Sequence, residues 1–138
     1  MAADFSGVWQ LDREGSAFAG PVPASLIMRI DHRGPDLTQQ IAATDANGAQ
    51  QRRIFTCRIG EETISAIGET SLYSRAHWLD GELLIETRMS RQGRDLLFRD
   101  FWSLSADGAR LVMAHRDDAL AGQIVTLTRA GESAFPSP

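Results

Sequence analysis

Few residues in this chain are arranged for chemistry, and the strongest pair among them is Asp100 with His115. A carboxylate beside an imidazole orients the ring and favours its charged form, so such a pair can act as a base, hold a ligand or donate hydrogen bonds. Acyl transfer would also need a nucleophile and an oxyanion hole, and the sequence has no Gly-x-Ser-x-Gly elbow. The simpler interpretation is a satisfied polar pair near the mouth of a barrel.

The histidines do not indicate a metal site. His32, His77 and His115 fall in separate segments, with no His-x-His or His-Glu-x-x-His spacing, so we predict no metal ligands. A haem with His115 as its axial ligand stays open as an alternative. We otherwise expect no cofactor, and no covalent or catalytic chemistry.

Two neighbouring residues bear on the inside of the fold. If Arg58 faces inward it needs a partner, because a buried guanidinium must be paired. An anionic ligand head group, Asp100 or Glu69 could supply that partner. Cys57 is the only cysteine, which excludes an intrachain disulfide and a cysteine metal cluster, and it is most simply a small packed side chain.

The composition excludes further classes of function. All 14 basic residues are arginine, so no lysine is present for Schiff-base or P-loop chemistry. The net charge of -4 argues against nucleic acid, which favours a basic face. No apolar run approaches the roughly 20 residues of a membrane-spanning helix, and the first residues do not resemble a signal peptide. We therefore expect no membrane span, and the compartment is left undetermined.

Turn signals divide the chain into short alternating runs. Asn47-Gly48, Asp80-Gly81, Gln92-Gly93 and Asp107-Gly108 supply the positive φ angles that hairpin loops need. Period-two alternation between the turns predicts strands, and sequential hairpins favour an up-and-down barrel over a sandwich. The predicted strands are Gly7–Arg13, Ser25–Asp31, Leu37–Thr44, Ala49–Ile59, Ser71–Leu79, Glu82–Ser90, Arg94–Ser105, Ala109–Arg116 and Gln123–Arg129.

The chain thus predicts an all-β fold, a single up-and-down antiparallel barrel of about 8–10 strands. Gly60–Thr70 is ambiguous and could hold one more short strand. The Gly- and Pro-rich segment Glu14–Ala24 predicts a loop rather than a helical lid. With no linker or repeat, residues 1–138 form one domain, and we expect residues 131–138 to be a frayed tail.

Each two-residue loop fixes a strand register, and the register fixes which side chains share a face. The loops at residues 80–81, 92–93 and 107–108 agree with one another and place Asp100 opposite His115. Their common face is mostly large and apolar, so we assign it to the interior. It comprises Ala76, Trp78, Leu83, Ile85, Thr87, Met89, Leu96, Phe98, Asp100, Trp102, Leu104, Leu111, Met113 and His115.

The other half of the sheet is read in the same way. A two-residue loop at Asn47-Gly48 pairs Gln39 with Thr56 and turns Arg58 inward, whereas a slip by one residue would bring in Phe55 and Cys57. A loop at Arg33-Gly34 would pair Ile30 with Leu37 and Met28 with Gln39. The inner face of this half is then Met28, Ile30, Gln39, Ile41, Ile54, Thr56 and Arg58. Outward apolar residues that could form a contact patch are Tyr73, Leu84, Leu97 and Phe101.

Gly7-Val8-Trp9 at the start of the first strand, followed by up-and-down strands, resembles the calycin group of lipocalins, fatty-acid-binding proteins and nitrobindin-like barrels. The resemblance implies that Trp9 closes the barrel floor and that Arg129 packs over it, both as structural residues. The segments 4–11, 76–87 and 102–108 also resemble small bacterial lipocalin-like proteins of unassigned function. Residues 14–24 are too short for the lid of fatty-acid-binding proteins, and the helix and disulfides of lipocalins are missing.

The function that these observations favour is the binding of a small apolar or amphipathic molecule inside the barrel, since eight or more strands can enclose one such ligand. Phe98, Trp102 and Met113 would form the apolar wall. Asp100, His115 and Arg58 would fix a polar end. The alternatives are a haem-binding barrel that uses His115, or a dimerising or partner-binding module with a packed interior.

Overall fold

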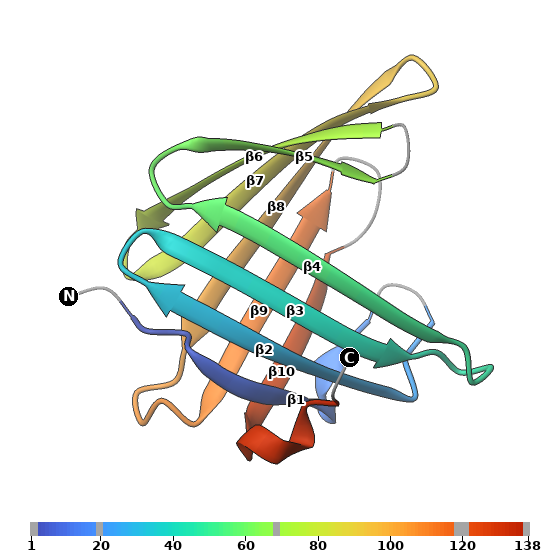
Figure 1. Cartoon of the computed structure of the whole chain (residues 1–138), viewed down its shortest axis with the longest axis vertical. Coiled ribbons are helices and arrows are strands. Elements are labelled where there is room, and N and C mark those ends of the chain that lie inside the picture. The colour runs from blue at the N-terminus through green and yellow to red at the C-terminus, as the bar shows by residue number, and fades with distance from the viewer. Residues whose placement is uncertain (1–2, 19–20, 68–69, 118–121, 137–138) are drawn as a thin grey trace.

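The computed structural model describes residues 3–18, 21–67, 70–117 and 122–136, and folds them into one antiparallel sheet of ten strands (Figure 1). The order of strands in the sheet begins at β4, runs back through β1 to β10, and then descends to β5. The elements are β1 (Gly7–Ala17), β2 (Ser25–Arg33), β3 (Asp36–Thr44), β4 (Gln50–Arg58), β5 (Glu62–Ile67), β6 (Thr70–Leu79), β7 (Glu82–Arg91), β8 (Arg94–Leu104), β9 (Arg110–Asp117), β10 (Gln123–Ala130) and the 3-10 turn η1 (Glu132–Ala134).

Pairing between β1 and β10 rolls the sheet into a barrel, and the predicted up-and-down fold is confirmed. The barrel is nearly closed, because β4 and β5 are the two ends of the sheet and meet at a seam. There the Arg58 amide donates a hydrogen bond to the Thr63 hydroxyl at 3.4 Å. No helix in the described part of the chain is long and apolar enough to cross a bilayer.

The predicted register of β6 to β9 is confirmed. Ala76 pairs with Ile85, Ile85 with Asp100, and Asp100 with His115. The loop at residues 80–81 has the backbone geometry that sets this register, because Asp80 and Gly81 have φ of 51° and 84°. Positive φ at both positions is the signature of a two-residue type I′ loop, whose twist matches the strands on either side.

The predicted register of β4 is wrong by one residue. The Gly48 amide donates to the Asp45 carbonyl (3.1 Å) and the Asp45 amide to the Ala49 carbonyl (2.9 Å), so the β3–β4 loop has three residues instead of two. Gln39 consequently pairs with Phe55, and Leu37 with Cys57. The shift turns Phe55 and Cys57 inward, and it turns Ile54, Thr56 and Arg58 outward.

The β2–β3 register also differs from the prediction, but without changing faces. The loop lies at Gly34-Pro35, so Ile30 pairs with Gln39, and Met28 with Ile41. This is a shift of two residues, and a shift of two keeps every side chain on its predicted side. Met28 and Ile30 are accordingly buried.

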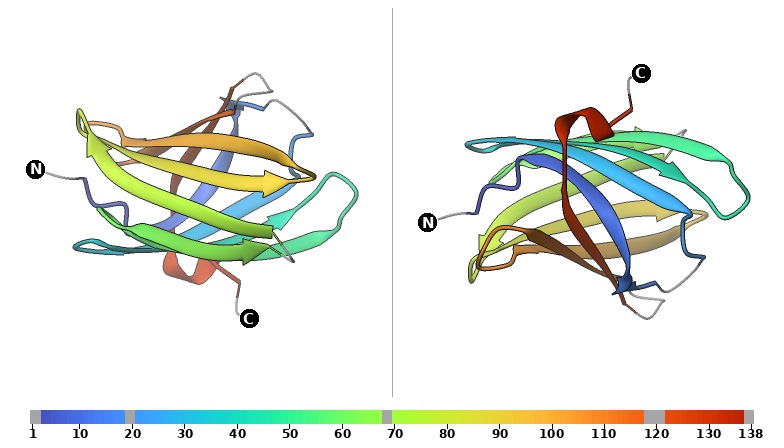
Figure 2. Two further views of the ribbon diagram at one scale, coloured as in Figure 1. Left: turned by 90° about the horizontal axis from the view of Figure 1, so that it is seen from above. Right: turned by 90° about the horizontal axis from the view of Figure 1, so that it is seen from below.

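The described part of the C-terminal tail, as far as residue 136, lies on the outside of the barrel (Figure 2). Arg29 forms an ion pair with Glu132 at 2.8 Å. The ring of Phe135 lies against the guanidinium groups of both Arg29 and Arg52, at 5.6 and 5.9 Å. These contacts tie the tail to β2 and to the edge strand β4.

Candidate functional site

The interior of the barrel has two unlike ends. The closed end, on the left of Figure 1, is bounded by the β2–β3, β6–β7 and β8–β9 loops and by the segment before β1. The open end is bounded by the β3–β4 and β7–β8 loops on the right. Inner residues near the closed end are almost fully buried: Phe5, Trp9, Leu37, Leu83, Leu111 and Leu127.

Burial falls toward the open end along the same strands. On β7, Leu83 and Ile85 are buried, whereas Thr87 and Met89 on the same face are half-buried. On β8, Trp102 is buried and Phe98 is half-buried. The inner face at the open end is therefore accessible to solvent, although its side chains point into the barrel.

A polar stripe crosses the interior where burial begins to fall. Cross-strand pairing aligns Ile85, Asp100, His115 and Gln123 in one row over four strands. His115 Nδ1 and Asp100 Oδ1 are 2.7 Å apart, and the two side chains are 33% and 28% exposed. A charge-assisted hydrogen bond of this length fixes the orientation of both groups.

Phe98 adds a flat apolar surface to this pair. Its ring stacks on the imidazole of His115, with centroids 5.5 Å apart and planes inclined by 23°. Phe98 and Asp100 are two residues apart on β8, and strand geometry puts both on the same face. The three side chains form the inner triad, a platform of one apolar ring, one imidazole and one carboxylate.

The floor of the barrel is made by aromatic side chains and the segment before β1. The Phe5 ring contacts the rings of His32, Trp78 and Trp102, with centroid distances of 5.7, 5.9 and 5.6 Å. The Phe5 amide donates a hydrogen bond to Nδ1 of His32 at 3.3 Å. His32 is thus engaged in packing the floor.

Trp9 and Arg129 lie together at this floor. The Arg129 guanidinium carbon is 4.3 Å from the centroid of the Trp9 ring. Arg129 also donates to the carbonyls of Gly108 and Ser6 at 2.9 and 3.1 Å, and the Trp9 indole donates to the Phe5 carbonyl at 3.0 Å. A side chain held by backbone carbonyls and an indole face fixes the structure locally.

The same contact explains the glycine of the Gly-Val-Trp motif. Gly7 has φ of 141°, and a Cβ built on it would lie 2.6 Å from Nη1 of Arg129. Glycine is the residue that tolerates both this backbone angle and this close approach. The glycine of the motif therefore leaves space for the Arg129 guanidinium to lie over the Trp9 ring.

The structure brings together only part of the predicted site. Phe98, Asp100 and His115 form the inner triad. Trp102 and Met113, predicted as part of the wall, belong to the buried cluster beneath, with 3% and 8% exposure.

Arg58 is not among the inner residues. It points outward, is 58% exposed, and pairs with Asp36 and Glu61 at 3.6 and 3.0 Å. Its predicted inward orientation followed from the β4 register and was wrong with it.

Arg53 is the inner residue that the sequence reasoning missed. It pairs with Ile41 and shares its face of β4 with Phe55 and Cys57, toward the open end. Its side chain is exposed and donates to the side-chain oxygen Oε1 of Gln51 at 3.4 Å. The available signal was Asp45, because aspartate at the first position favours a type I turn and hence the longer loop.

Other reactive chemistry finds no support among the described residues. No group of three or more His, Cys, Asp or Glu side chains in the described ranges could hold a metal ion. Burial raises the pKa of the Cys57 thiol to about 11. A thiol of that pKa is a poor nucleophile near neutral pH, because the thiolate is the reactive form.

No protein-family model matches this sequence, and no curated protein sequence matches it. Solved structures do resemble it. A fatty acid binding protein of Schistosoma mansoni, in complex with arachidonic acid, has a TM-score of 0.60 and 13% identity, with 92% of this chain and 96% of that chain covered.

Two further structures share the fold. A zebrafish ileal bile acid-binding protein complexed with cholic acid has a TM-score of 0.60 and 17% identity, covering 91% of this chain and 98% of that chain. A secretory abundant heat soluble protein of Ramazzottius varieornatus has a TM-score of 0.63 and 12% identity, covering 91% of this chain and 94% of that chain. At these identities the likeness shows the fold, and the chain has a calycin-like β-barrel.

Proposed function

We propose that this protein binds one small apolar or amphipathic molecule in the open half of its barrel, with residues 1–138 acting as one domain. The observation that carries the proposal is the inner triad, which is half-buried and lies above a fully packed floor. Apolar walls with a few convergent polar groups are typical of small-molecule sites.

In this proposal the two ends of the ligand meet different residues. The apolar part lies against Phe98 and the upper surface of Trp102 and Met113. The polar part forms hydrogen bonds with the Asp100–His115 pair. The 2.7 Å contact between the two side chains holds that pair in place. Arg53, at the open end of β4, adds a cation to the rim.

The structural neighbours support this reading, since two of them were solved with arachidonic acid and cholic acid. Both are amphipathic molecules. The alignments cover more than nine-tenths of this chain, and this likeness of fold supports an amphipathic ligand by analogy.

The test is a titration with Nile red, an uncharged dye whose fluorescence rises in apolar sites. We expect saturable binding, displaced by arachidonate or cholate, and about tenfold weaker in Phe98→Ala because a buried ring contact is lost. The matched control is Phe101→Ala, also on β8, which faces the outside of the sheet and lies outside both candidate sites. Absence of saturable binding, or equal loss in both variants, would overturn the proposal.

Two further measurements, haem addition and the mass in solution, test the two alternatives. A Soret band on haem addition that disappears in His115→Ala would assign a haem-binding barrel instead. A mass that rises with protein concentration, without dye binding, would assign a homodimer or partner-binding module that uses outward apolar residues.

A further inference from the structure

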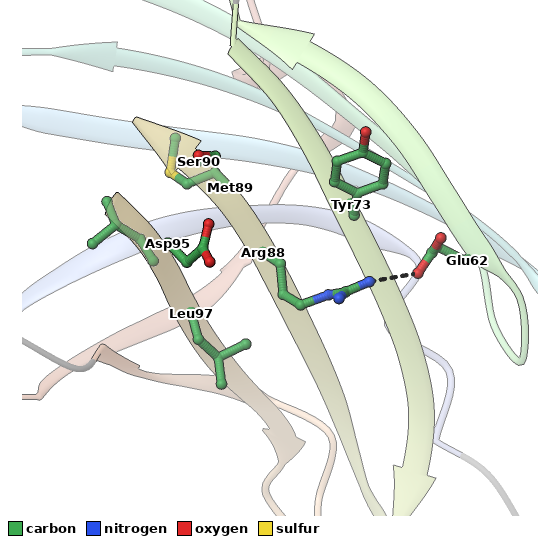
Figure 3. A pocket seen from close by; sticks show the side chains of 8 residues that line it. Glu62, Tyr73, Arg88, Met89, Ser90, Asp95 and Leu97 are labelled. Carbon is green, nitrogen blue, oxygen red and sulfur yellow. Dashed lines mark hydrogen bonds and ion pairs between the residues drawn. The ribbon is translucent and has the colours of Figure 1, made fainter. Parts of the chain in front are cut away.

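A hollow lined mainly from the outer face of the sheet forms a second candidate site, and the inward-facing Met89 and Leu96 also border it. It has a volume of about 440 Å³, and Figure 3 shows the side chains that line it on β5, β6, β7 and β8. Tyr73, Arg88 and Leu97 lie in one cross-strand row, on the sheet face opposite to the inner triad. The full lining is Glu62, Tyr73, Arg88, Met89, Ser90, Asp95, Leu96 and Leu97.

The hollow continues along the sheet as a groove. An adjoining hollow of about 310 Å³ is lined by four of the same residues and also by Arg75 and Glu86. The four shared residues are Glu62, Tyr73, Arg88 and Leu97. We call the 440 Å³ hollow alone the outer groove. Its volume is in the range of small-molecule sites.

The charges of the outer groove do not balance. Arg88 already has a counterion, because its guanidinium lies 3.1 Å from the Glu62 carboxylate (Figure 3). Asp95 pairs with Ser90 in the strand register and is exposed, and within the described ranges no ion pair or side-chain hydrogen bond engages it. One negative charge is therefore left over among the groove's lining residues.

The apolar part of the outer groove lies beside this charge. Tyr73 is a large, partly apolar side chain that is 39% exposed. Leu97 is half-buried on the neighbouring strand and contributes a second apolar surface. A tyrosine ring also attracts cations through its negative face.

We propose that the outer groove binds a small organic cation with an apolar body, such as an arylalkyl amine. Its ammonium group lies at Asp95, and its body packs between Tyr73 and Leu97. A cation is favoured because it completes the charge balance, whereas an anion would have to displace Glu62 from Arg88. The charged and aromatic residues used here lie on the outer face, so this proposal does not rest on ligand binding inside the barrel.

The chain offers a clean probe of this groove. Tyr73 is its only tyrosine, so labelling with 3-fluorotyrosine gives a single ¹⁹F NMR signal from the site. We expect 2-phenylethylamine to shift this signal saturably. The uncharged 2-phenylethanol and the anion 3-phenylpropionate share the same ring and should bind at least about tenfold more weakly. Equal responses to all three compounds, or no response to the amine, would overturn the proposal.

Variants locate the charge. Asp95→Asn should weaken amine binding about tenfold, through loss of a charge-assisted hydrogen bond. Asp31→Asn removes an exposed carboxylate from β2, outside the groove, and should leave the affinity unchanged. Unfolding curves of both variants check that the fold is intact. An affinity that Asp95→Asn does not change, or that Asp31→Asn lowers equally, would contradict the site.

Discussion

The closed and open ends of this barrel are built on the same strands but have different chemistry. At the closed end, inner side chains are almost fully buried, and the polar groups of Trp9 and Arg129 are held by backbone carbonyls. At the open end, the inner triad is half-buried, and its carboxylate and imidazole are held by each other. We infer that the same strands stabilise the fold at the closed end and, in the proposed function, bind the ligand at the open end.

The largest effect is expected at the closed end. Trp9→Ala removes a fully buried indole, and we expect it to cost about 3–5 kcal/mol of unfolding free energy. Phe98→Ala, at the open end, should cost about 1 kcal/mol, because a half-exposed ring loses less contact. Urea unfolding of the two variants measures both values. Similar losses would remove the distinction between the ends.

The second effect is a pH dependence that comes from Cys57 in the closed half. Its pKa is raised from 9.0 to about 11 by burial, so the folded state holds the proton more tightly than the unfolded chain does. The contribution is complete below pH 9 and is lost as pH rises toward 11, by about 2 kcal/mol. Comparing urea unfolding of wild type and Cys57→Ala at pH 8 and pH 10.5 isolates it. A difference between the two proteins that does not change with pH would contradict this prediction.

The third effect concerns the cation over the floor. Arg129→Leu keeps apolar volume but loses the indole contact and the hydrogen bonds to Gly108 and Ser6. We expect a loss of about 1–2 kcal/mol in thermal or urea unfolding. Arg129→Lys should recover part of it, because a cation can still lie over Trp9. If Arg129→Leu leaves the unfolding free energy unchanged, this contact does not stabilise the closed end.

The smallest effect on stability is expected at the inner triad. The double variant Asp100→Asn, His115→Gln keeps the polarity and approximate size of both groups, so unfolding free energy should change by less than about 1 kcal/mol. Affinity for an amphipathic ligand should fall about fivefold in the same protein, because the carboxylate and the imidazole that it orients are both gone. A large stability loss with unchanged affinity would place this pair with the structural residues instead.

The sequence predicted the fold and one half of the sheet well, for a local reason. The β6–β7 and β7–β8 loops have two residues each, so turn chemistry fixed their registers. The β8–β9 loop spans residues 106–109, because the Ser105 amide donates to the Arg110 carbonyl at 2.9 Å, and one extra residue on each side of the predicted turn keeps Asp100 opposite His115. At the β3–β4 loop, Asp45 instead accepts hydrogen bonds from the amides of Asn47 and Ala49, both at 2.9 Å. That one added residue turned Arg58 outward.

Two further features depend on contacts between distant parts of the chain, which local patterns do not report. The tail is held by Phe135 between Arg29 and Arg52, more than 80 residues away. The outer groove depends on Arg88 reaching Glu62 across β6. Turn and alternation signals predict only which residues are neighbours within a hairpin, so they predict neither arrangement.

The central claim is that a ligand enters the open half while the closed half stays packed, and methionine methyl groups test it most directly. Met113 lies two residues before His115 on the same face, at the edge of the core cluster with 8% exposure. Met28 lies within the same cluster with 2% exposure, and its sulfur accepts a hydrogen bond from Gln39 at 3.4 Å. With ¹³C-methyl methionine, titration with 1-anilinonaphthalene-8-sulfonate should shift the Met113 signal saturably and leave Met28 in place. A Met28 shift as large as that of Met113, or no shift of Met113, would contradict the claim.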